Sequence, residues 1–457
     1  MSHKTDPKSS LEAPTRVRYG VLGFACALSM ITYLDRVCFG TVAPIIEREF
    51  GLTSTQKGML FTAFALAYAA FEVPSGWLGD VFGPRRTLIR IVLWWSVFTA
   101  LTGMVYPAAA WPSFAFAAML AVRFFFGMGE AGAYPNIARA FHNWFPFSEW
   151  GFAQGAVWMA GRFAGGITPM VVTILLFEST SIAGEVVTHW RHAFWIFGFI
   201  GVAWCGVFWL WFRDLPEQKP SVNQAELDLI RSETGGIEPI HAKVPWRYFL
   251  TSGNLWVLCV MYFMGAYGWY FNITWLPGFL TERYGIGKDQ FWTFTLMAGS
   301  PLLFGSVACL LGGYLTDQFI RTTGNRKWGR RLYGVLGHGI AAICYFLSIF
   351  AESPWAFILA ITVATFWNDM TMGSAWASCL DIGGRYSGTV AGCMNTIGNL
   401  GGASAGYATG WVLKYSGYGW TANFFLFGLV YVIATLCWLR FDSTKPVVPE
   451  GDLLNSA

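Results

Sequence analysis

Residues 76–86 read Gly-Trp-Leu-Gly-Asp-Val-Phe-Gly-Pro-Arg-Arg, and the organisation of the whole chain can be worked out from this segment. Its first five residues, Gly76 to Asp80, recur as Gly-Tyr-Leu-Thr-Asp from Gly313 to Asp317, an offset of 237 residues. The same offset matches further glycines and polar residues: Gly155, Gly161 and Gly165 with Gly392, Gly398 and Gly402, Tyr33 with Tyr270, and Asp35 with Asn272. Several matches at one offset predict a duplicated unit.

The composition is that of a membrane protein. Of the 457 residues, 55% are hydrophobic and 12% are charged, whereas about 25% charged residues is usual in soluble chains. This excludes a disordered chain, a secreted disulfide domain and a soluble enzyme, and a net charge of +4 is too small for a nucleic-acid-binding surface. Twelve apolar runs approach or exceed the roughly 20 residues that a spanning helix needs: 20–46, 56–80, 87–106, 112–138, 150–177, 191–213, 255–281, 291–317, 331–350, 355–382, 386–412 and 421–440.

The nine cysteines all fall inside these runs and form no Cys-x-x-Cys pair. The sequence therefore predicts neither a disulfide framework nor a metal site, and the cysteines are interpreted as small residues in helix packing. It also contains no nucleophile–base set and no phosphate-binding loop. We expect no cofactor and no enzymatic activity.

The distribution of Lys and Arg predicts the orientation. With a cytoplasmic N-terminus, 21 of the 30 basic residues lie in cytoplasmic segments and 6 in the opposite loops, so the positive-inside rule places both termini in the cytoplasm. We read the first apolar run as a retained helix, not a cleaved signal peptide. The predicted divisions are a cytoplasmic tail at 1–19, a six-helix half at 20–213, a cytoplasmic linker at 214–250, a second six-helix half at 251–440 and a cytoplasmic tail at 441–457. Duplicated halves around a central cavity are the architecture of secondary transporters.

The repeated segment ends each time in a basic turn, with Arg85 and Arg86 after the first copy. Gly76, Gly79 and Gly83 would let helices approach closely. Asp80 and Asp317 could bind a helix N-terminus or a loop arginine. The plainer alternative is an ordinary positive-inside turn. The pattern resembles the cytoplasmic loop signature of the major facilitator superfamily, which implies an all-α fold of twelve transmembrane helices in two pseudo-symmetric halves.

Charged residues inside the apolar runs point to the site. Those that carry the argument are Asp35, Arg36, Arg123, Glu130, Arg162 and Asp369. A charge near the bilayer centre costs about 2.5–3.5 kcal/mol, so such residues usually face a cavity. Arg123 and Glu130 are seven residues apart and lie within about 20° of one helical stripe, with Gly127 between them making room for a ligand. Three arginines suit a carboxylate, because a guanidinium binds it with two hydrogen bonds.

The acidic residues require a different role, because they repel an anion. In a low-dielectric site a carboxyl group favours its neutral form, so Asp35 and Glu130 could carry protons. The alternative is that Asp35–Arg36 and Arg123–Glu130 are internal ion pairs. Glu72 is either functional or a partner for a loop arginine, and Asp369 serves in coupling or in polar packing. Whether Arg162 reaches the cavity or braces another helix stays open.

The second half offers neutral polar side chains: Tyr267, Tyr270, Asn272, Asn395 and Asn399. The 237-residue offset makes Asn399 the counterpart of Arg162. We therefore expect the first half to hold an anionic head group and the second half to hydrogen-bond hydroxyl groups.

A closer resemblance is to the anion:cation symporter branch of the superfamily, which includes sugar-acid, hexuronate and sialic acid carriers. The motifs are Tyr33-Leu34-Asp35-Arg36, Arg123-(x)6-Glu130-Ala131, Trp144-Phe145-Pro146, Thr274-Trp275-Leu276-Pro277, Asp381-Ile382-Gly383-Gly384 and Met394-Asn395-Thr396-Ile397-Gly398-Asn399. The resemblance implies that Asp35 and Glu130 couple protons and that Arg36 and Arg123 bind the substrate carboxylate. Tyr68 matches a tyrosine of sugar-acid carriers, and Arg162 lies where members differ and could favour a dianion. The segment Gly265-Ala266 lacks the arginine of glutamate carriers.

The resulting expectation is a monomeric proton symporter of the bacterial inner membrane. Its partners would be the lipid bilayer, protons and a small organic anion, most simply an aldonate, aldarate or hexuronate. A sodium-coupled or uncoupled carrier of organic or inorganic anions is the alternative within the same class. A membrane receptor that binds without translocation is the alternative from another class.

Overall fold

The computed structural model describes residues 13–107, 112–176, 180–182, 185–187, 190–234, 244–286 and 290–449. Parts of all five predicted divisions lie outside the described residues. They are residues 1–12 of the N-terminal tail, 108–111, 177–179, 183–184 and 188–189 of the first half, 235–243 of the linker, 287–289 of the second half and 450–457 of the C-terminal tail.

The structure consists of helices and one short hairpin. The first part of the chain forms α1 (Arg18–Phe50), α2 (Ser54–Phe82), α3 (Pro84–Thr102), α4 (Pro112–Glu130), α5 (Ala133–Trp144), α6 (Trp150–Leu176) and α7 (Trp190–Trp211). Strands β1 (Thr180–Ile182) and β2 (Glu185–Val187) pair antiparallel between α6 and α7. The linker contains α8 (Gln224–Thr234) and α9 (Trp246–Thr251). The remainder forms α10 (Gly253–Thr274), α11 (Leu276–Tyr284), α12 (Phe291–Thr323), α13 (Arg326–Ser348), α14 (Pro354–Gly383), α15 (Ser387–Tyr415) and α16 (Trp420–Arg440).

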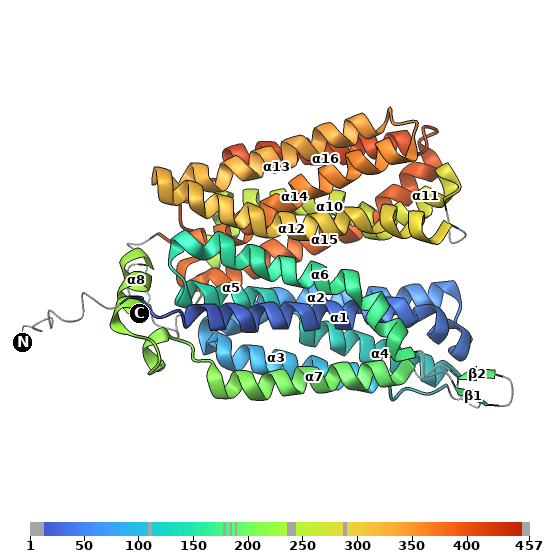
Figure 1. The fold of residues 1–457 in the computed structure, drawn as a ribbon, viewed down its shortest axis with the longest axis horizontal. Coiled ribbons are helices and arrows are strands. Elements are labelled where there is room, and N and C mark those ends of the chain that lie inside the picture. Colours follow the sequence, from blue (N-terminus) through green and yellow to red (C-terminus); the bar gives the residue numbers. More distant parts are fainter. Residues whose placement is uncertain are drawn as a thin grey trace, which may run out of the picture.

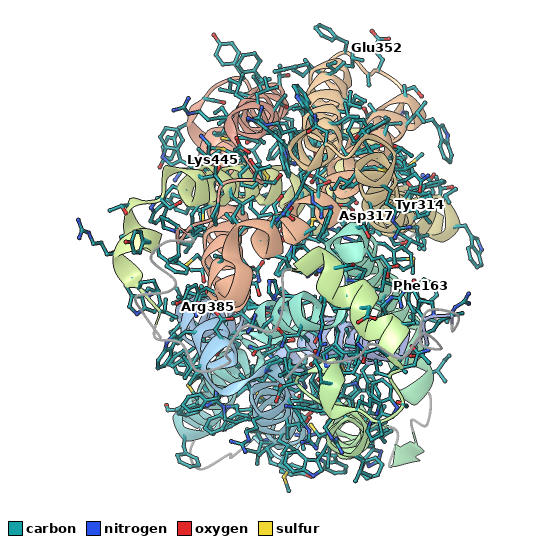
Figure 2. The ribbon with its side chains drawn as sticks, turned by 90° about the vertical axis from the view of Figure 1, so that its left-hand side faces the viewer. Phe163, Tyr314, Asp317, Glu352, Arg385 and Lys445 are labelled. Atoms are coloured by element: carbon teal, nitrogen blue, oxygen red, sulfur yellow. The ribbon has the colours of Figure 1, made fainter. Side chains whose placement is uncertain are left out.

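Two helical bundles lie side by side (Figure 1). Helices α1 to α7 form one bundle and α10 to α16 the other, and they meet where α2 and α5 pack on α15 and where α6 packs on α12 and α14. The start of α1 and helix α8 lie at one end of the molecule, which we call the linker end, and the β-hairpin lies at the opposite end. Figure 2 looks onto the linker end, where Asp317 and Arg385 lie near the junction of the bundles.

The twelve apolar runs all form helices, so the predicted fold class is confirmed. Run 112–138 differs by being divided into α4 and α5 at Gly132, which has a φ of +88° that favours glycine. Run 255–281 is divided into α10 and α11 at Trp275, just before Pro277, whose missing N–H is tolerated in the first turn of a new helix. Among the described residues, six helical segments meet both the length and the apolar composition that crossing a membrane requires.

Glycines set how closely the bundles approach. Gly76 of α2 packs against the carbonyl of Gly388 on α15, and Gly313 of α12 packs against the carbonyl of Gly151 on α6. A Cβ atom at Gly76 or Gly313 would overlap the facing main chain. The offset of 237 residues relates Gly76 to Gly313 and Gly151 to Gly388. Each copy of the repeated segment therefore makes an equivalent contact with the other bundle.

Candidate functional site

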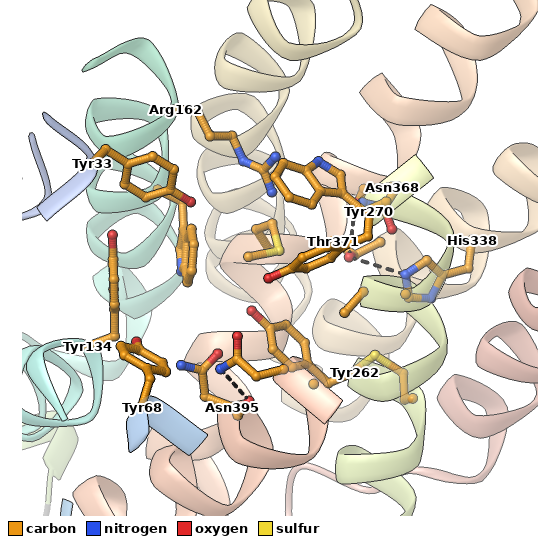
Figure 3. Close-up of a pocket in the computed structure, with 18 of the residues that line it drawn as sticks. Tyr33, Tyr68, Tyr134, Arg162, Tyr262, Tyr270, His338, Asn368, Thr371 and Asn395 are labelled. Atoms are coloured by element: carbon orange, nitrogen blue, oxygen red, sulfur yellow. Dashed lines mark hydrogen bonds between the residues drawn. The ribbon is translucent and has the colours of Figure 1, made fainter. Parts of the chain in front are cut away.

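A cavity lined by residues of both bundles lies at their junction (Figure 3). Six of the predicted site residues line it: Arg36, Tyr68, Arg162, Tyr270, Asn395 and Asn399. Asp35, Arg123 and Glu130 are not among its lining residues. The structure thus brings most of the predicted substrate-binding residues together and places the predicted proton carriers behind them.

Arg36 of α1 is held by Glu130 of α4. Its Nε lies 3.0 Å from Oε1 and 2.9 Å from Oε2 of Glu130. The Glu130 side chain is fully buried, whereas the Arg36 side chain is 25% exposed. The guanidinium also lies over the ring of Tyr68, 4.4 Å from its centroid, and its Nη2 has no hydrogen-bond partner among the described residues. An ion pair does form here, but it joins Arg36 of α1 to Glu130 of α4. The pairs considered from the sequence were Asp35–Arg36 and Arg123–Glu130, each within one helix.

Arg123 lies deeper in the first bundle. Its guanidinium is enclosed by the rings of Phe39, Phe64 and Phe126, with centroids 4.0, 5.0 and 4.8 Å away. Gly127, which we expected to make room for a ligand, instead packs against the main chain of Phe64. The small residue serves the close contact of α4 with α2, so that expectation was wrong.

Asp35 is also buried, with 2% of its surface exposed. Its carboxylate lies near the side chains of Thr99 and Trp95. It also interacts electrostatically with Glu130 and Arg123. No hydrogen bond of normal geometry reaches either carboxylate oxygen from the described residues. Asp35 and Arg123 therefore form a second layer of charge beneath the Arg36–Glu130 pair.

Arg162 of α6 crosses to the second bundle. Its Nη1 lies 2.9 Å from Oδ2 of Asp369 on α14, and both side chains are buried. Asn368 donates to the other oxygen of Asp369 at 3.0 Å. The guanidinium also lies 4.5 Å from the ring centroid of Trp269 and faces the cavity (Figure 3). The structure thus answers the open question about Arg162, because the side chain both reaches the cavity and bridges the bundles.

Glu72 of α2 forms a second bridge. It is fully buried and accepts hydrogen bonds from the side-chain amides of Asn395 and Asn399 on α15, the latter at 3.2 Å. The loop arginine that we considered as its partner plays no part in these bonds. The two asparagines that were expected to meet substrate hydroxyls are therefore engaged with a carboxyl group.

Aromatic side chains complete the cavity wall, and sequence reasoning gave them little weight. Tyr33, Tyr134 and Trp158 come from the first bundle, and Tyr262 and Trp269 from the second. The rings of Tyr134 and Trp158 stack 4.6 Å apart. Trp158 lies one helical turn before Arg162, and this spacing predicts that the two side chains share one face of the helix.

The repeated segments close the linker end. Asp80 accepts hydrogen bonds from the main-chain N–H groups of Gly388 at 3.0 Å and Thr389 at 2.6 Å, at the start of α15. Asp317 accepts from Gly151 at 3.1 Å and Phe152 at 2.6 Å, at the start of α6. Carboxylates are favoured at helix N-termini, where N–H groups are unpaired.

Each carboxylate also has an arginine nearby. Nε of Arg139 lies 3.7 Å from Asp80, and Nη1 of Arg330 lies 2.9 Å from Asp317. Arg330 also pairs with Asp381 at 2.8 Å. Each of these ion pairs lies within one bundle, whereas the main-chain hydrogen bonds of Asp80 and Asp317 cross from one bundle to the other.

The remaining motif residues shape the first loop. Asp214, just after α7, accepts from the main-chain N–H of Arg85 at 2.7 Å, which caps α3. Gly83 has a φ of +85°, and Gly79 packs against the side chain of Asn136. The guanidinium of Arg85 donates to the carbonyl of Trp209, and Arg86 is exposed.

Comparison with known proteins agrees with this architecture. The model of the Major Facilitator Superfamily matches residues 25–406. A probable sulfoacetate transporter of Cupriavidus necator is 34% identical over 88% of this chain and 89% of its own length. A probable galactarate/D-glucarate transporter of Escherichia coli is 27% identical over 91% of this chain and 92% of its own length.

Among solved structures, the proton:xylose symporter XylE has the same fold, with a TM-score of 0.73 at 12% identity over 96% of this chain and 98% of that one. At this identity the likeness extends to the fold alone. The family match, however, spans most of the chain, including both copies of the repeated segment. The chain therefore belongs to the Major Facilitator Superfamily and is a membrane transporter, not an enzyme.

Proposed function

We propose that the protein is a proton-coupled symporter that carries a small organic carboxylate across the membrane by alternating access. The observation that supports this most directly is Arg36. Its side chain lines the cavity, its buried Nη2 has no hydrogen-bond partner among the described residues, and its Nε is fixed by the buried Glu130. An arginine presented in this way can bind a carboxylate, and its own counter-ion is a group able to take a proton.

Proton coupling follows from competition for Arg36. When Glu130 is ionised, it occupies the Nε edge of the guanidinium and offsets the charge that would attract a substrate. Protonation of Glu130 removes that competing charge, so substrate and proton favour each other's binding. Asp35 lies close enough to feel the charge of Glu130 and can share this role. Arg123 contributes positive charge from beneath the cavity wall.

We propose a sugar acid as the substrate class. The relatives that carry galactarate, glucarate and hexuronate support this class. Tyrosines on both sides of the cavity, including Tyr33, Tyr262 and Tyr270, can hydrogen-bond hydroxyl groups, and their ring faces suit C–H groups. Asn395 and Asn399 join them once protonation or movement of α2 weakens their bonds to Glu72.

The closed linker end indicates how the cycle is arranged. Asp80 and Asp317 hold the bundles together there, so the substrate enters from the opposite end and leaves when these contacts open. Following the positive-inside rule, we assign the linker end and both termini to the cytoplasm of a bacterial inner membrane. A single chain contains the whole cavity and works as a monomer.

Uptake into proteoliposomes tests the proposal. A panel of radiolabelled aldonates, aldarates and hexuronates is offered with and without an inward proton gradient. We expect gradient-driven accumulation of at least one acid, abolished by a protonophore. Glu130→Gln should lose proton-driven accumulation yet keep part of its substrate exchange. Glu352→Gln, an exposed residue at the opposite end, is the matched control.

The alternatives give different results in the same assay. Accumulation that follows a sodium gradient and survives the protonophore would favour a sodium-coupled carrier, and equilibration without accumulation would favour a facilitator. Binding with no uptake would favour a receptor. Unchanged proton-driven accumulation in Glu130→Gln would remove that residue from the coupling mechanism.

A further inference from the structure

The Arg162–Asp369 bridge is a second charged position of the cavity, separate from the Arg36–Glu130 pair. Arg162 is 7% exposed, lines the cavity and lies over Trp269. Although Nη1 is only 2.9 Å from Asp369, neither Nη1 nor Nε makes a hydrogen bond of normal geometry to a described residue. Asp369 therefore balances the charge of the guanidinium, while Nε and Nη1 remain without a well-formed hydrogen bond to any described residue.

Both arginines belong to the same cavity. Arg36 and Arg162 line it together with Tyr33 of α1. In Figure 3 the side chains of Tyr33 and Arg162 both point into this space. A ligand with one anionic group needs one arginine, whereas a ligand with an anionic group at each end can occupy both.

Resting on the proposed function, we propose that the site is built for small dianions. One anionic group binds Arg36, and the other replaces Asp369 on Arg162. Asp369 takes up a proton from the water of the cavity as the bridge between the bundles opens. The second group can be a carboxylate or a sulfonate, because both present oxygens that accept two parallel N–H bonds.

The surroundings of Asp369 support the exchange. Its other titratable neighbours are Cys309 of α12 and Tyr431 of α16, and His338 of α13 lies beyond Asn368. Arg162 in turn faces Tyr33, Tyr262 and Cys309. All of these groups except Arg162 are uncharged near neutral pH, so a substrate that takes Arg162 leaves Asp369 without a cation among the described residues. A buried carboxylate in that position must take up a proton, because an unpaired buried charge is costly.

Binding to the purified, full-length protein tests this inference by isothermal titration calorimetry. Glucarate and gluconate have the same six-carbon chain, but glucarate has two carboxylates and gluconate has one. Malonate and sulfoacetate distinguish a carboxylate from a sulfonate as the second group. Repeating the titrations in buffers with different ionisation enthalpies counts the protons taken up. The variants are Arg162→Gln and Asp369→Asn, and Arg247→Gln on the exposed surface of α9 is the matched control.

We expect the wild-type protein to bind a dianion more tightly than gluconate and to take up one more proton with glucarate than with gluconate. Arg162→Gln should lower the ratio of the two affinities roughly 10- to 100-fold, as expected for loss of a charge-assisted contact. Asp369→Asn should keep the preference for glucarate but abolish the additional proton, a result that a purely structural bridge would not give.

Two results would overturn the inference. One is an equal affinity for monoanions and dianions, and the other is an Arg162→Gln effect of the same size on both. The proposed function fails separately, if no carboxylate accumulates in proteoliposomes under a proton gradient. Accumulation of gluconate without a preference for glucarate would therefore reject the dianion site and leave the symporter standing.

Discussion

Asp317→Asn should open the linker end. Asp317 accepts two main-chain hydrogen bonds at the start of α6 and one from Arg330. Asparagine with its oxygen in the place of Oδ1 keeps the bonds from Gly151 and Arg330 and turns an NH₂ group toward the main-chain N–H of Phe152. A hydrogen bond to a charged group contributes about 1.5–3 kcal/mol. We estimate that the closed arrangement loses about 1.5–3 kcal/mol, which shifts the closed-to-open ratio roughly 10- to 150-fold.

Asp80→Asn provides an internal comparison, because the two carboxylates are related by the repeat. Asp80 also accepts from the hydroxyl of Thr389, and a hydroxyl can instead accept from the new NH₂ group. Its arginine, Arg139, is more distant at 3.7 Å. Asp80→Asn should therefore open the linker end less than Asp317→Asn does.

Distances between spin labels at Phe82 and Thr322 report the opening. Both positions are exposed near the linker end, one on each bundle. The three partly exposed cysteines, Cys26, Cys393 and Cys437, are first replaced by alanine. We expect Asp317→Asn to add a population at longer distance. Asp228→Asn on α8 changes the charge at the same end without joining the bundles and should leave the distances unchanged. A folded Asp317→Asn protein with wild-type distances would refute the reasoning.

Two further predictions concern the contacts between the bundles. Gly313→Ala should destabilise the closed state by about 1–3 kcal/mol, because its methyl group overlaps the main chain of Gly151, whereas Gly406→Ala enters open space and should be neutral. The same label distances check this, and equal behaviour of the two variants would contradict it. Glu72→Gln should cost about 1–3 kcal/mol of stability in detergent, since one of the two oxygens that accept from Asn395 and Asn399 becomes an NH₂ donor facing another donor. A denaturant midpoint equal to that of the wild-type protein would show that this bridge adds no stability.

The sequence predicted most of the fold because its signals are local. Apolar runs identify spanning helices, and the offset of 237 residues identifies the repeat. The two divided helices were missed, although Gly132 and Pro277 mark them. Both residues are tolerated within spanning helices, so their presence alone does not locate a break.

The partners of the charged residues could not be predicted in the same way. Arg36 and Glu130 are 94 residues apart, and Arg162 and Asp369 are 207 apart. Helical spacing shows which residues share a face, but the facing helix is fixed only by packing of the whole bundle. For this reason Arg123 and Gly127 looked like cavity residues, yet the structure buries one among phenylalanines and packs the other against α2.

The charges around the cavity connect its residues to proton movement. They include three arginines and four acidic residues: Arg36, Arg123, Arg162, Asp35, Glu72, Glu130 and Asp369. With all seven ionised, their sum is already −1, and every anion that enters makes it more negative. Each uncompensated charge in a buried site costs several kcal/mol. Proton uptake by these carboxyl groups offsets the added charge without moving the main chain. On the proposed symport mechanism, one proton for each negative charge on the substrate keeps the sum at its resting value, so we expect two protons with a dianion.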